Sequence, residues 1–212
     1  MLKLKVVVGS TRPGRAADRV VPWIVGRAEE HSAFDVEVLD LRDWPLPLFA
    51  ETYQTVGDPL DPCYSDPVVK HWNRRIVEGD VFVFVTPEYN HSIPAVLKNA
   101  IDSVFASFGF RNKAAAFVGY SAGVAAGARA IEHLAHVAIE AEMVPLRNTV
   151  LLPFVGDAFD EHGKPKNAAS ETAVSLMLDD LQWWGTTLQT ARRLNELQPA
   201  AFRKIATTGK RQ

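Results

Sequence analysis

The sequence predicts an α/β fold in which a parallel sheet is covered by helices on both faces. Short apolar runs alternate with amphipathic helical patterns along the whole chain. Several of these runs, such as DVFVFV at 80–85, are apolar on both sides, which is typical of strands buried on both faces. A length of 212 residues, 47% of them apolar, is enough for one large core, so we expect a single domain over 1–198.

The first half of the chain gives two strands and a long loop. An apolar run at 4–8 ends at Gly9, and residues 16–30 carry apolar side chains at helical spacing. DVEVLDL at 35–41 alternates as a second strand. The proline-rich stretch 43–67 has little periodicity, so we interpret it as a loop whose length points to a functional or interfacial role.

The second half continues the alternation. Ser170 is the expected N-cap of the closing helix, and residues 199–212 are expected to form a loose tail or an arm on a neighbouring subunit. The expected helices are 68–78, 94–103 with Pro94 in its first turn, 127–142 and 170–194, and the expected strands are 80–85, 113–120 and 144–152.

Charge and cysteine content exclude several classes. Lys and Arg number 23 against 25 Asp and Glu, so no polybasic surface for nucleic acid is expected. No apolar run approaches the ~20 residues that cross a bilayer, so we expect no membrane association. The lone Cys63 cannot form an intrachain disulfide, and the first residues do not resemble a signal peptide. We therefore expect a soluble, cytoplasmic protein.

Polar residues follow the first predicted strand, in GSTRPGR at 9–15. Backbone N–H groups and the positive end of the following helix favour a phosphate here. Ser10, Thr11, Arg12 and Arg15 add hydroxyl donors and positive charge. The alternative is an ordinary turn whose polar residues only cap the helix. The spacing matches neither the Walker A motif nor G-x-G-x-x-G.

Two further loops follow the third and fourth strands. TPEYNHSIP at 86–94 has prolines on either side of Tyr89 and Asn90, which predicts a stiff ledge suited to a planar heterocycle; packing of Tyr89 in the core is the alternative. GYSAG at 119–123 is rich in small residues that let a ligand approach the backbone. In open α/β sheets, ligands bind where such loops meet.

Taken together, the motifs GSTRPGR at 9–15 and TPEYNHSIPAVLKNAID at 86–102 resemble those of the NADPH-dependent FMN reductase family. The likeness extends over about 2–152. It implies a flavodoxin-like three-layer sandwich with a five-stranded parallel sheet of order 2-1-3-4-5. It also implies FMN as cofactor, NADPH or NADH as co-substrate, and a homodimer or a tetramer of dimers, because a partner subunit often supplies one wall of the site.

The resemblance also assigns residues to the flavin. It implies that the phosphate is held by the loop after the first strand, where many relatives have Ser or Asn at positions 15–17. Because hydride passes between the nicotinamide and the flavin, we expect no catalytic side chain and no metal. The expected cofactor-binding residues are Ser10, Thr11, Arg12, Arg15, Ala16 and Ala17 for the phosphate, Pro87, Glu88, Tyr89 and Asn90 along the ring and ribityl chain, and Ser121 and Gly123 on the other side.

The expected reaction is hydride transfer from NAD(P)H through FMN to a small acceptor such as a quinone, free flavin or azo compound, with ping-pong kinetics. One alternative is an FMN-binding electron carrier, although such carriers are usually strongly acidic and this chain has a net charge of −2. Another is a serine hydrolase, because GYSAG matches G-x-S-x-G around Ser121.

Three other features have simpler interpretations. His133, His136 and Glu140 share one face of a predicted helix, but the opposite face is apolar, so we expect the histidines to face solvent or a partner and not a metal. Asp40 resembles a ribose-binding acid, but without the glycine fingerprint a turn or capping role is expected. The adjacent Trp183 and Trp184 are expected to be core or interface residues.

Overall fold

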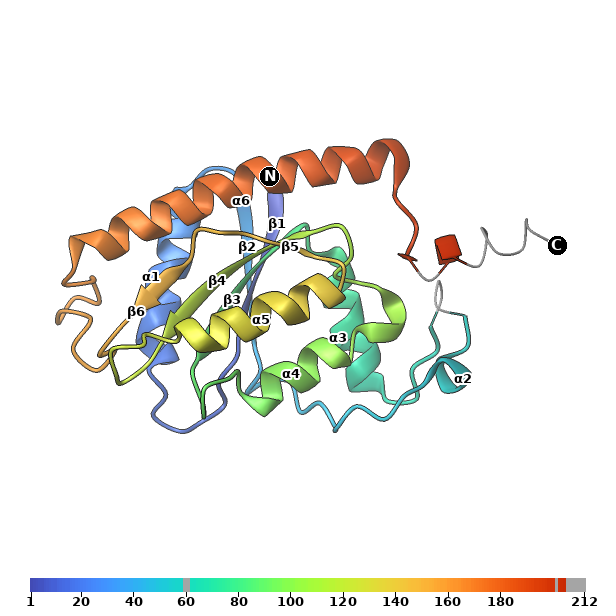
Figure 1. Ribbon diagram of the computed structural model, residues 1–212, viewed down its shortest axis with the longest axis horizontal. Helices are drawn as coiled ribbons and strands as arrows, with labels where there is room; N and C mark the ends of the chain where they lie inside the picture. The colour runs from blue at the N-terminus through green and yellow to red at the C-terminus, as the bar shows by residue number, and fades with distance from the viewer. Residues whose placement is uncertain (59–61, 201, 205–212) are drawn as a thin grey trace.

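The computed structural model describes residues 1–58, 62–200 and 202–204. Strands and helices alternate over most of its length (Figure 1). The strands are β1 (Leu2–Val8), β2 (Phe34–Asp40), β3 (Val81–Pro87), β4 (Ala114–Tyr120), β5 (Val144–Pro145) and β6 (Val150–Leu152). The helices are α1 (Ala17–Glu30), α2 (Tyr53–Val56), α3 (Pro67–Glu78), α4 (Ala95–Asp102), α5 (Ala128–Glu140) and α6 (Ala168–Asn195), with a 3-10 turn at Phe105–Ser107.

The strands form one parallel sheet in the order β2-β1-β3-β4-β5, and β6 also pairs with β4. This order confirms the flavodoxin-like prediction, with one difference. The expected strand 144–152 is split, because β5 pairs with the beginning of β4 and β6 with its end. The two short strands together occupy the edge position that the fifth strand was expected to fill.

Alternating side chains of the central strands explain why both faces are buried. Val83 and Val85 face one apolar layer, whereas Phe82 and Phe84 face the other. Helices α1 and α6 cover the valine face, and α3, α4 and α5 cover the phenylalanine face (Figure 1). A strand that is apolar at every position therefore has a helical layer on each side.

One terminal detail differs from the sequence expectations. Helix α6 is capped by Asn167, whose side chain accepts a hydrogen bond from the backbone N–H of Ala169, so the expectation of Ser170 as N-cap was wrong. Ser170 lies within the helix and is buried. Residues 201 and 205–212 of the predicted tail lie outside the described residues. Within the described part, the ring of Phe202 contacts that of Phe108, with the centroids 5.7 Å apart.

Trp183 and Trp184 lie on the outer surface of α6. Trp183 is 62% exposed and Trp184 is 37% exposed, so neither belongs to the core of the described chain. Their interface role stays a prediction. No helix among the described residues combines the length and apolar character needed to span a membrane.

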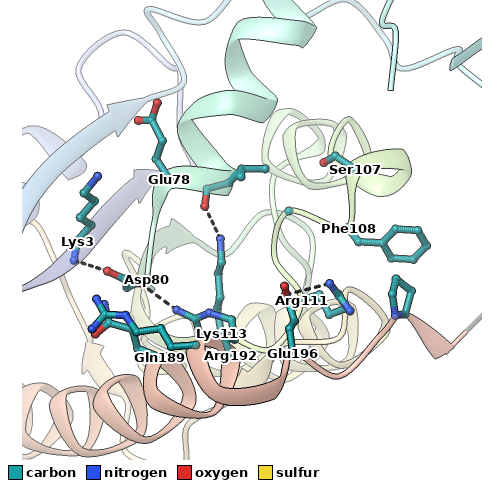
Figure 2. Close-up of a pocket in the computed structure, with 14 residues that line it drawn as sticks. Lys3, Glu78, Asp80, Ser107, Phe108, Arg111, Lys113, Gln189, Arg192 and Glu196 are labelled. Atoms are coloured by element: carbon teal, nitrogen blue, oxygen red, sulfur yellow. Dashed lines mark hydrogen bonds and ion pairs between the residues drawn. The ribbon is translucent and has the colours of Figure 1, made fainter. Parts of the chain in front are cut away.

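The amino-terminal edge of the sheet has a polar cavity of about 590 Å³ (Figure 2). Lys113 enters it just before β4, and its ammonium donates to the carbonyls of Ile76 and Val77 at the end of α3, at 3.1 and 2.8 Å. Two other cations there are paired, Arg192 with Asp80 and Arg111 with Glu196. These contacts fasten the ends of α3 and α6 to the sheet.

Burial, followed by repulsion from Arg192, lowers the pKa of Lys113 from 10.5 to about 7. Above pH 7 the unfolded chain therefore binds a proton that the folded chain does not, so the free energy of unfolding rises with pH. We expect a contribution of up to about 1.4 kcal/mol per pH unit between pH 7 and 9.5 in urea titrations. Lys113→Met removes this slope, whereas Lys3→Met, which changes an exposed lysine, keeps it. An unchanged slope in Lys113→Met would contradict the assignment.

Candidate functional site

Three loops meet at the carboxyl edge of the sheet because β1, β3 and β4 are parallel and in register. Val8 pairs with Val85, and Pro87 pairs with Tyr120, so the loops that follow lie side by side. A cavity of about 270 Å³ opens between them. It is lined by Ser10, Arg12, Pro13, Gly14, Arg15, Ala16, Pro87, Glu88, Tyr89, Tyr120, Ser121, Ala122 and Val155.

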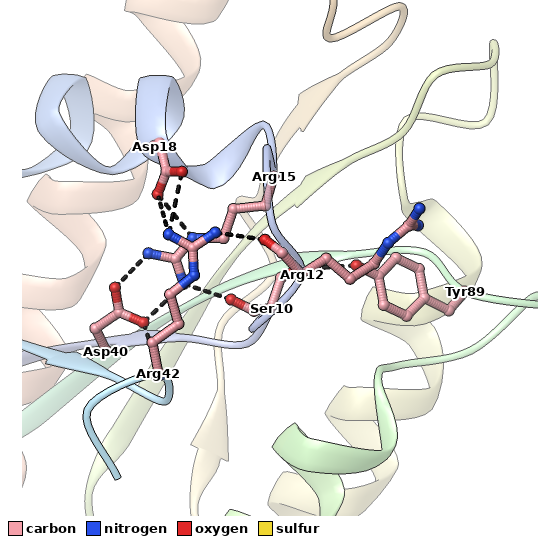
Figure 3. A network of polar contacts seen from close by, with 7 residues as sticks. All are labelled: Ser10, Arg12, Arg15, Asp18, Asp40, Arg42 and Tyr89. Atoms are coloured by element: carbon pink, nitrogen blue, oxygen red, sulfur yellow. Dashed lines mark hydrogen bonds and ion pairs between the residues drawn. The ribbon is translucent and has the colours of Figure 1, made fainter.

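Tyr89 connects the first loop to the second. Its hydroxyl lies 2.8 Å from the hydroxyl of Ser10, whose side chain is fully buried. The guanidinium of Arg12 lies over the Tyr89 ring, 5.3 Å from the centroid (Figure 3). Tyr89 is thus half-buried at the junction of the two loops. The alternative interpretation, in which Tyr89 packs in the core, was wrong.

Arg15 belongs to an ion-pair network beneath the first loop (Figure 3). Its Nη1 donates to Asp40 at 2.7 Å, its Nε donates to Asp18 at 2.8 Å, and Nη1 also donates to the backbone carbonyl of Ser10. Arg42 donates to both oxygens of Asp18 at 3.3 Å and to the carbonyl of Arg12. The network therefore ties the loop to the ends of β2 and α1.

This network also explains Asp40. Its carboxylate accepts from the backbone N–H of Arg42 at 3.0 Å, as a turn role predicts, and it also pairs with Arg15. Burial acts to raise the pKa of Asp40, but the hydrogen bonds from Arg15 and Arg42 outweigh it and hold the pKa below its usual value. The hydrogen bond to Asp40 likewise raises the pKa of Arg15. Both groups are charged throughout the physiological range.

The amino end of α1 has unused capacity for an anion. Its N-cap is Ala16, which offers no side-chain hydrogen bond to the first turn. Gly14 has φ +65°, a conformation that side-chain-bearing residues rarely adopt, and this turns the chain into the helix. Ala16 lines the same cavity as Ser10 and Arg12, so the positive end of the helix dipole lies beside it.

Tyr120 is the site residue that sequence reasoning missed. It is 3% exposed, and its hydroxyl finds no hydrogen-bond partner in the part of the chain that the structure describes. Burial, with repulsion from Tyr89, outweighs the lowering effects of Arg15 and of the nearby Ser10 side chain and raises its pKa well above the usual range, so the hydroxyl is neutral. A buried, unpaired hydroxyl that lines a cavity is a position for a ligand atom. Its place at the end of β4 was the available signal.

The second loop is a tight hairpin. The N–H of Tyr89 donates to the carbonyl of Ser92 at 2.8 Å, and the return bond is 3.0 Å. Between them, Asn90 and His91 have φ values of 50° and 67°. Two central residues with positive φ are what a type I′ hairpin turn requires. This turn therefore adds to the stiffness expected from the prolines.

The third loop does not support the hydrolase alternative. The hydroxyl of Ser121 donates to the carbonyl of Gly123 at 2.9 Å, within its own loop. A nucleophile elbow needs a strained backbone at the serine, but Ser121 does not have a positive φ. Within the described chain, no histidine bonds to Ser121; His133 contacts Ser92 instead. No group of three metal-binding side chains occurs there either.

The cavity brings together most of the predicted cofactor-binding residues. Those that line it are Ser10, Arg12, Arg15, Ala16, Pro87, Glu88, Tyr89 and Ser121. Thr11, Asn90 and Gly123 belong to the same loops but do not line it. Ala17 does not line it either, because it is the first residue of α1 and is fully buried in the core. Arg15 lies against the cavity wall with its charge directed to Asp18 and Asp40 (Figure 3).

The family model of NADPH-dependent FMN reductases matches residues 2–157. The chain belongs to the NADPH-dependent FMN reductase family. It is 30% identical over 186 residues to an NAD(P)H-dependent FMN reductase of Pseudomonas aeruginosa, which covers 86% of this chain and 95% of that protein. A reductase of the same name from Schizosaccharomyces pombe is 37% identical over 105 residues, but this match spans only about half of either chain, 49% and 50%.

The fold agrees with a solved structure, that of the flavoenzyme NAD(P)H:(acceptor) oxidoreductase from Paracoccus denitrificans. The TM-score is 0.71 at 21% identity, over 88% of this chain and 98% of that one. The family assignment confirms an FMN-dependent oxidoreductase that uses NAD(P)H. The residues present fit the cofactor, because the cavity combines a helix N-terminus without a side-chain cap and the Tyr120 hydroxyl, which has no hydrogen-bond partner among the described residues.

We expect Tyr120→Phe to weaken FMN binding about three- to tenfold, the usual effect of one lost neutral hydrogen bond. Quenching of flavin fluorescence by the apoprotein measures the affinity. Tyr53→Phe is the matched control, because Tyr53 is 43% exposed and lies outside this cavity. Wild-type affinity in Tyr120→Phe would show that the hydroxyl does not contact the cofactor.

Proposed function

We propose that the protein passes two electrons from NADPH or NADH to a small planar acceptor, of which a quinone is the first candidate, through FMN held at the carboxyl edge of the sheet. The observation that carries this proposal is the convergence of three loops on one cavity that contains an uncapped helix N-terminus and an unpaired buried hydroxyl. Family membership supports the general reaction.

The first loop would bind the phosphate. Ser10 and Thr11 supply hydroxyl donors, Arg12 supplies charge, and the helix dipole adds to it. Ala16 and Ala17 supply no side-chain donor, but their small size lets an anion reach the backbone N–H groups. Arg15 would act from behind: because it holds Asp40 and the carbonyl of Ser10, it keeps the loop in shape.

The second and third loops would border the ring and the ribityl chain. Pro87, Glu88, Tyr89 and Asn90 form the rigid side, fixed by the hairpin bonds to Ser92. Ser121 and Gly123 would close the opposite side, where small residues permit close backbone approach. Backbone N–H groups along this rim would stabilise negative charge without any ionised side chain.

When bound, FMN supplies an N5 atom that accepts hydride from nicotinamide C4 and returns it to an acceptor. The chain therefore needs no acid or base for this step. Its part is to hold the ring edge rigid while leaving one face open, so that NAD(P)H and the acceptor use that face in turn. A quinone, free flavin or azo compound would stack there.

A second subunit would supply the remaining wall. Val124 is 80% exposed and Phe154 is 56% exposed, and both flank the third loop, where the N–H of Phe154 donates to the carbonyl of Gly123 at 3.4 Å. Two large apolar side chains exposed beside a cavity favour burial against a partner. We propose a homodimer or a tetramer of dimers, in the reducing cytoplasm that the single exposed Cys63 suits.

Steady-state kinetics with NADPH and a benzoquinone test the reaction. We expect parallel double-reciprocal lines, and anaerobic NADPH alone should bleach the flavin before any acceptor is added. Intersecting lines would contradict alternate use of one face. A yellow protein that oxidises neither NADPH nor NADH would be an electron carrier instead.

Light scattering coupled to gel filtration tests the assembly. We expect a dimer or tetramer of the 23.4 kDa chain, and Val124→Glu should dissociate it and lower the turnover rate. The control is Val77→Glu, because Val77 is 52% exposed on the opposite edge of the sheet. A fully active monomer would defeat the proposal.

A further inference from the structure

Helix α5 contacts the second loop through two side chains one turn apart. Arg129 pairs with the carboxylate of Glu88, and its Nη1 lies 2.8 Å from Nε2 of His91. His133 places Nδ1 3.0 Å from the hydroxyl of Ser92. A spacing of four residues puts both on one helix face. The contacts fall just before the hairpin at 89–92, within its turn and at its last residue.

Glu88 depends on this contact. Its side chain is 5% exposed, and its second carboxylate oxygen, Oε2, is buried and has no partner in the described chain. Arg129 is the cation paired with it there, although Arg129 itself is 44% exposed. A buried carboxylate that loses its only counter-charge is strongly unfavourable. Glu88 also lines the cofactor cavity, so its charge lies beside the flavin site.

The start of α5 is itself fixed to the sheet. Gly127, just before the helix, has φ +86°, and a Cβ atom on it would lie 2.7 Å from the backbone nitrogen of Tyr120. Only glycine allows this approach. Arg129 therefore projects from a helix end packed on β4 and connects this helix end to the second loop.

We infer that Arg129 is a positioning residue of the flavin site. By holding Glu88 and His91, it keeps the positive-φ turn of the hairpin along the flavin rim, and it also balances the charge of Glu88. The inference rests on the proposed FMN site. It predicts an effect on the ring end of the cofactor and on its reduction, and not on the phosphate end.

The test compares FMN with riboflavin, which lacks the phosphate. Arg129→Gln should weaken both about tenfold, because it disturbs the ring shelf. Arg12→Gln should weaken FMN binding more than riboflavin binding, because it removes a charge at the phosphate end. Arg74→Gln, on the exposed face of α3, is the matched control and should change neither by more than about twofold.

The flavin midpoint potential supplies a readout that a merely structural role would not move. In Arg129→Gln the unbalanced Glu88 carboxylate should oppose negative charge on the reduced flavin and make the potential more negative. The double variant Glu88→Gln/Arg129→Gln should return it toward the wild-type value. If Arg129→Gln does not fold, Arg129→Lys carries the test: it should keep the potential but weaken riboflavin binding, because it loses the reach to His91.

The inference would be overturned if Arg129→Gln kept both the wild-type riboflavin affinity and the wild-type potential. Where Arg129→Lys carries the test, wild-type riboflavin affinity in that variant would overturn it. Such a result in a protein that still binds FMN and oxidises NADPH leaves the proposed function standing. If the wild-type protein binds no FMN, the proposed function fails first. The two failures are therefore distinguishable.

Discussion

The site depends on the register of three parallel strands. Because β1, β3 and β4 are parallel and in register, their carboxyl ends lie at one edge of the sheet, and the turns after Val8, Pro87 and Tyr120 are adjacent although they are far apart in sequence. Strand β3 is buried along its whole length and is apolar from Val81 to Val85, so it needs a helical layer on each face of the sheet. The buried strands thus determine where polar groups converge, and the loops determine what binds.

The chemistry of the loops is organised by contacts behind the cavity as much as by those within it. Arg15 and Asp40 shape the first loop from below, and Arg129 braces the second from α5. Both pairs include a largely buried member, so each charge is useful only while its partner is present. The flat cofactor would then meet a surface that is already formed, which lowers the ordering cost of binding.

The sequence was sufficient for the fold and for the main loops, because periodicity and the two motifs are local signals. It could not show the split of the last strand, which depends on how β5 and β6 each pair with β4. Nor could it show the direction of a side chain: Arg15 was predicted as a phosphate ligand, but its guanidinium lies against Asp18 and Asp40. The helix cap at Asn167 was missed because Ser170 offered an equivalent local signal.

The same limit applies to Tyr120 and Arg129. The sequence around Arg129 gives no signal, and Tyr120 is marked just by its place in GYSAG at the end of the fourth strand. The roles of both arise from strand register and from the packing of α5 on β4. Tertiary contacts of this kind decide which polar atoms remain unpaired, as the buried hydroxyl of Tyr120 does in the described chain.

A crystal structure of the protein with FMN would show where the cofactor binds. We expect the phosphate at the amino end of α1 beside Ser10 and Arg12, within reach of the Tyr120 hydroxyl, and the ring along the hairpin at 89–92. FMN bound instead in the polar cavity at the other edge of the sheet, around Lys113, would contradict this expectation, and so would a carboxyl-edge cavity closed by side chains.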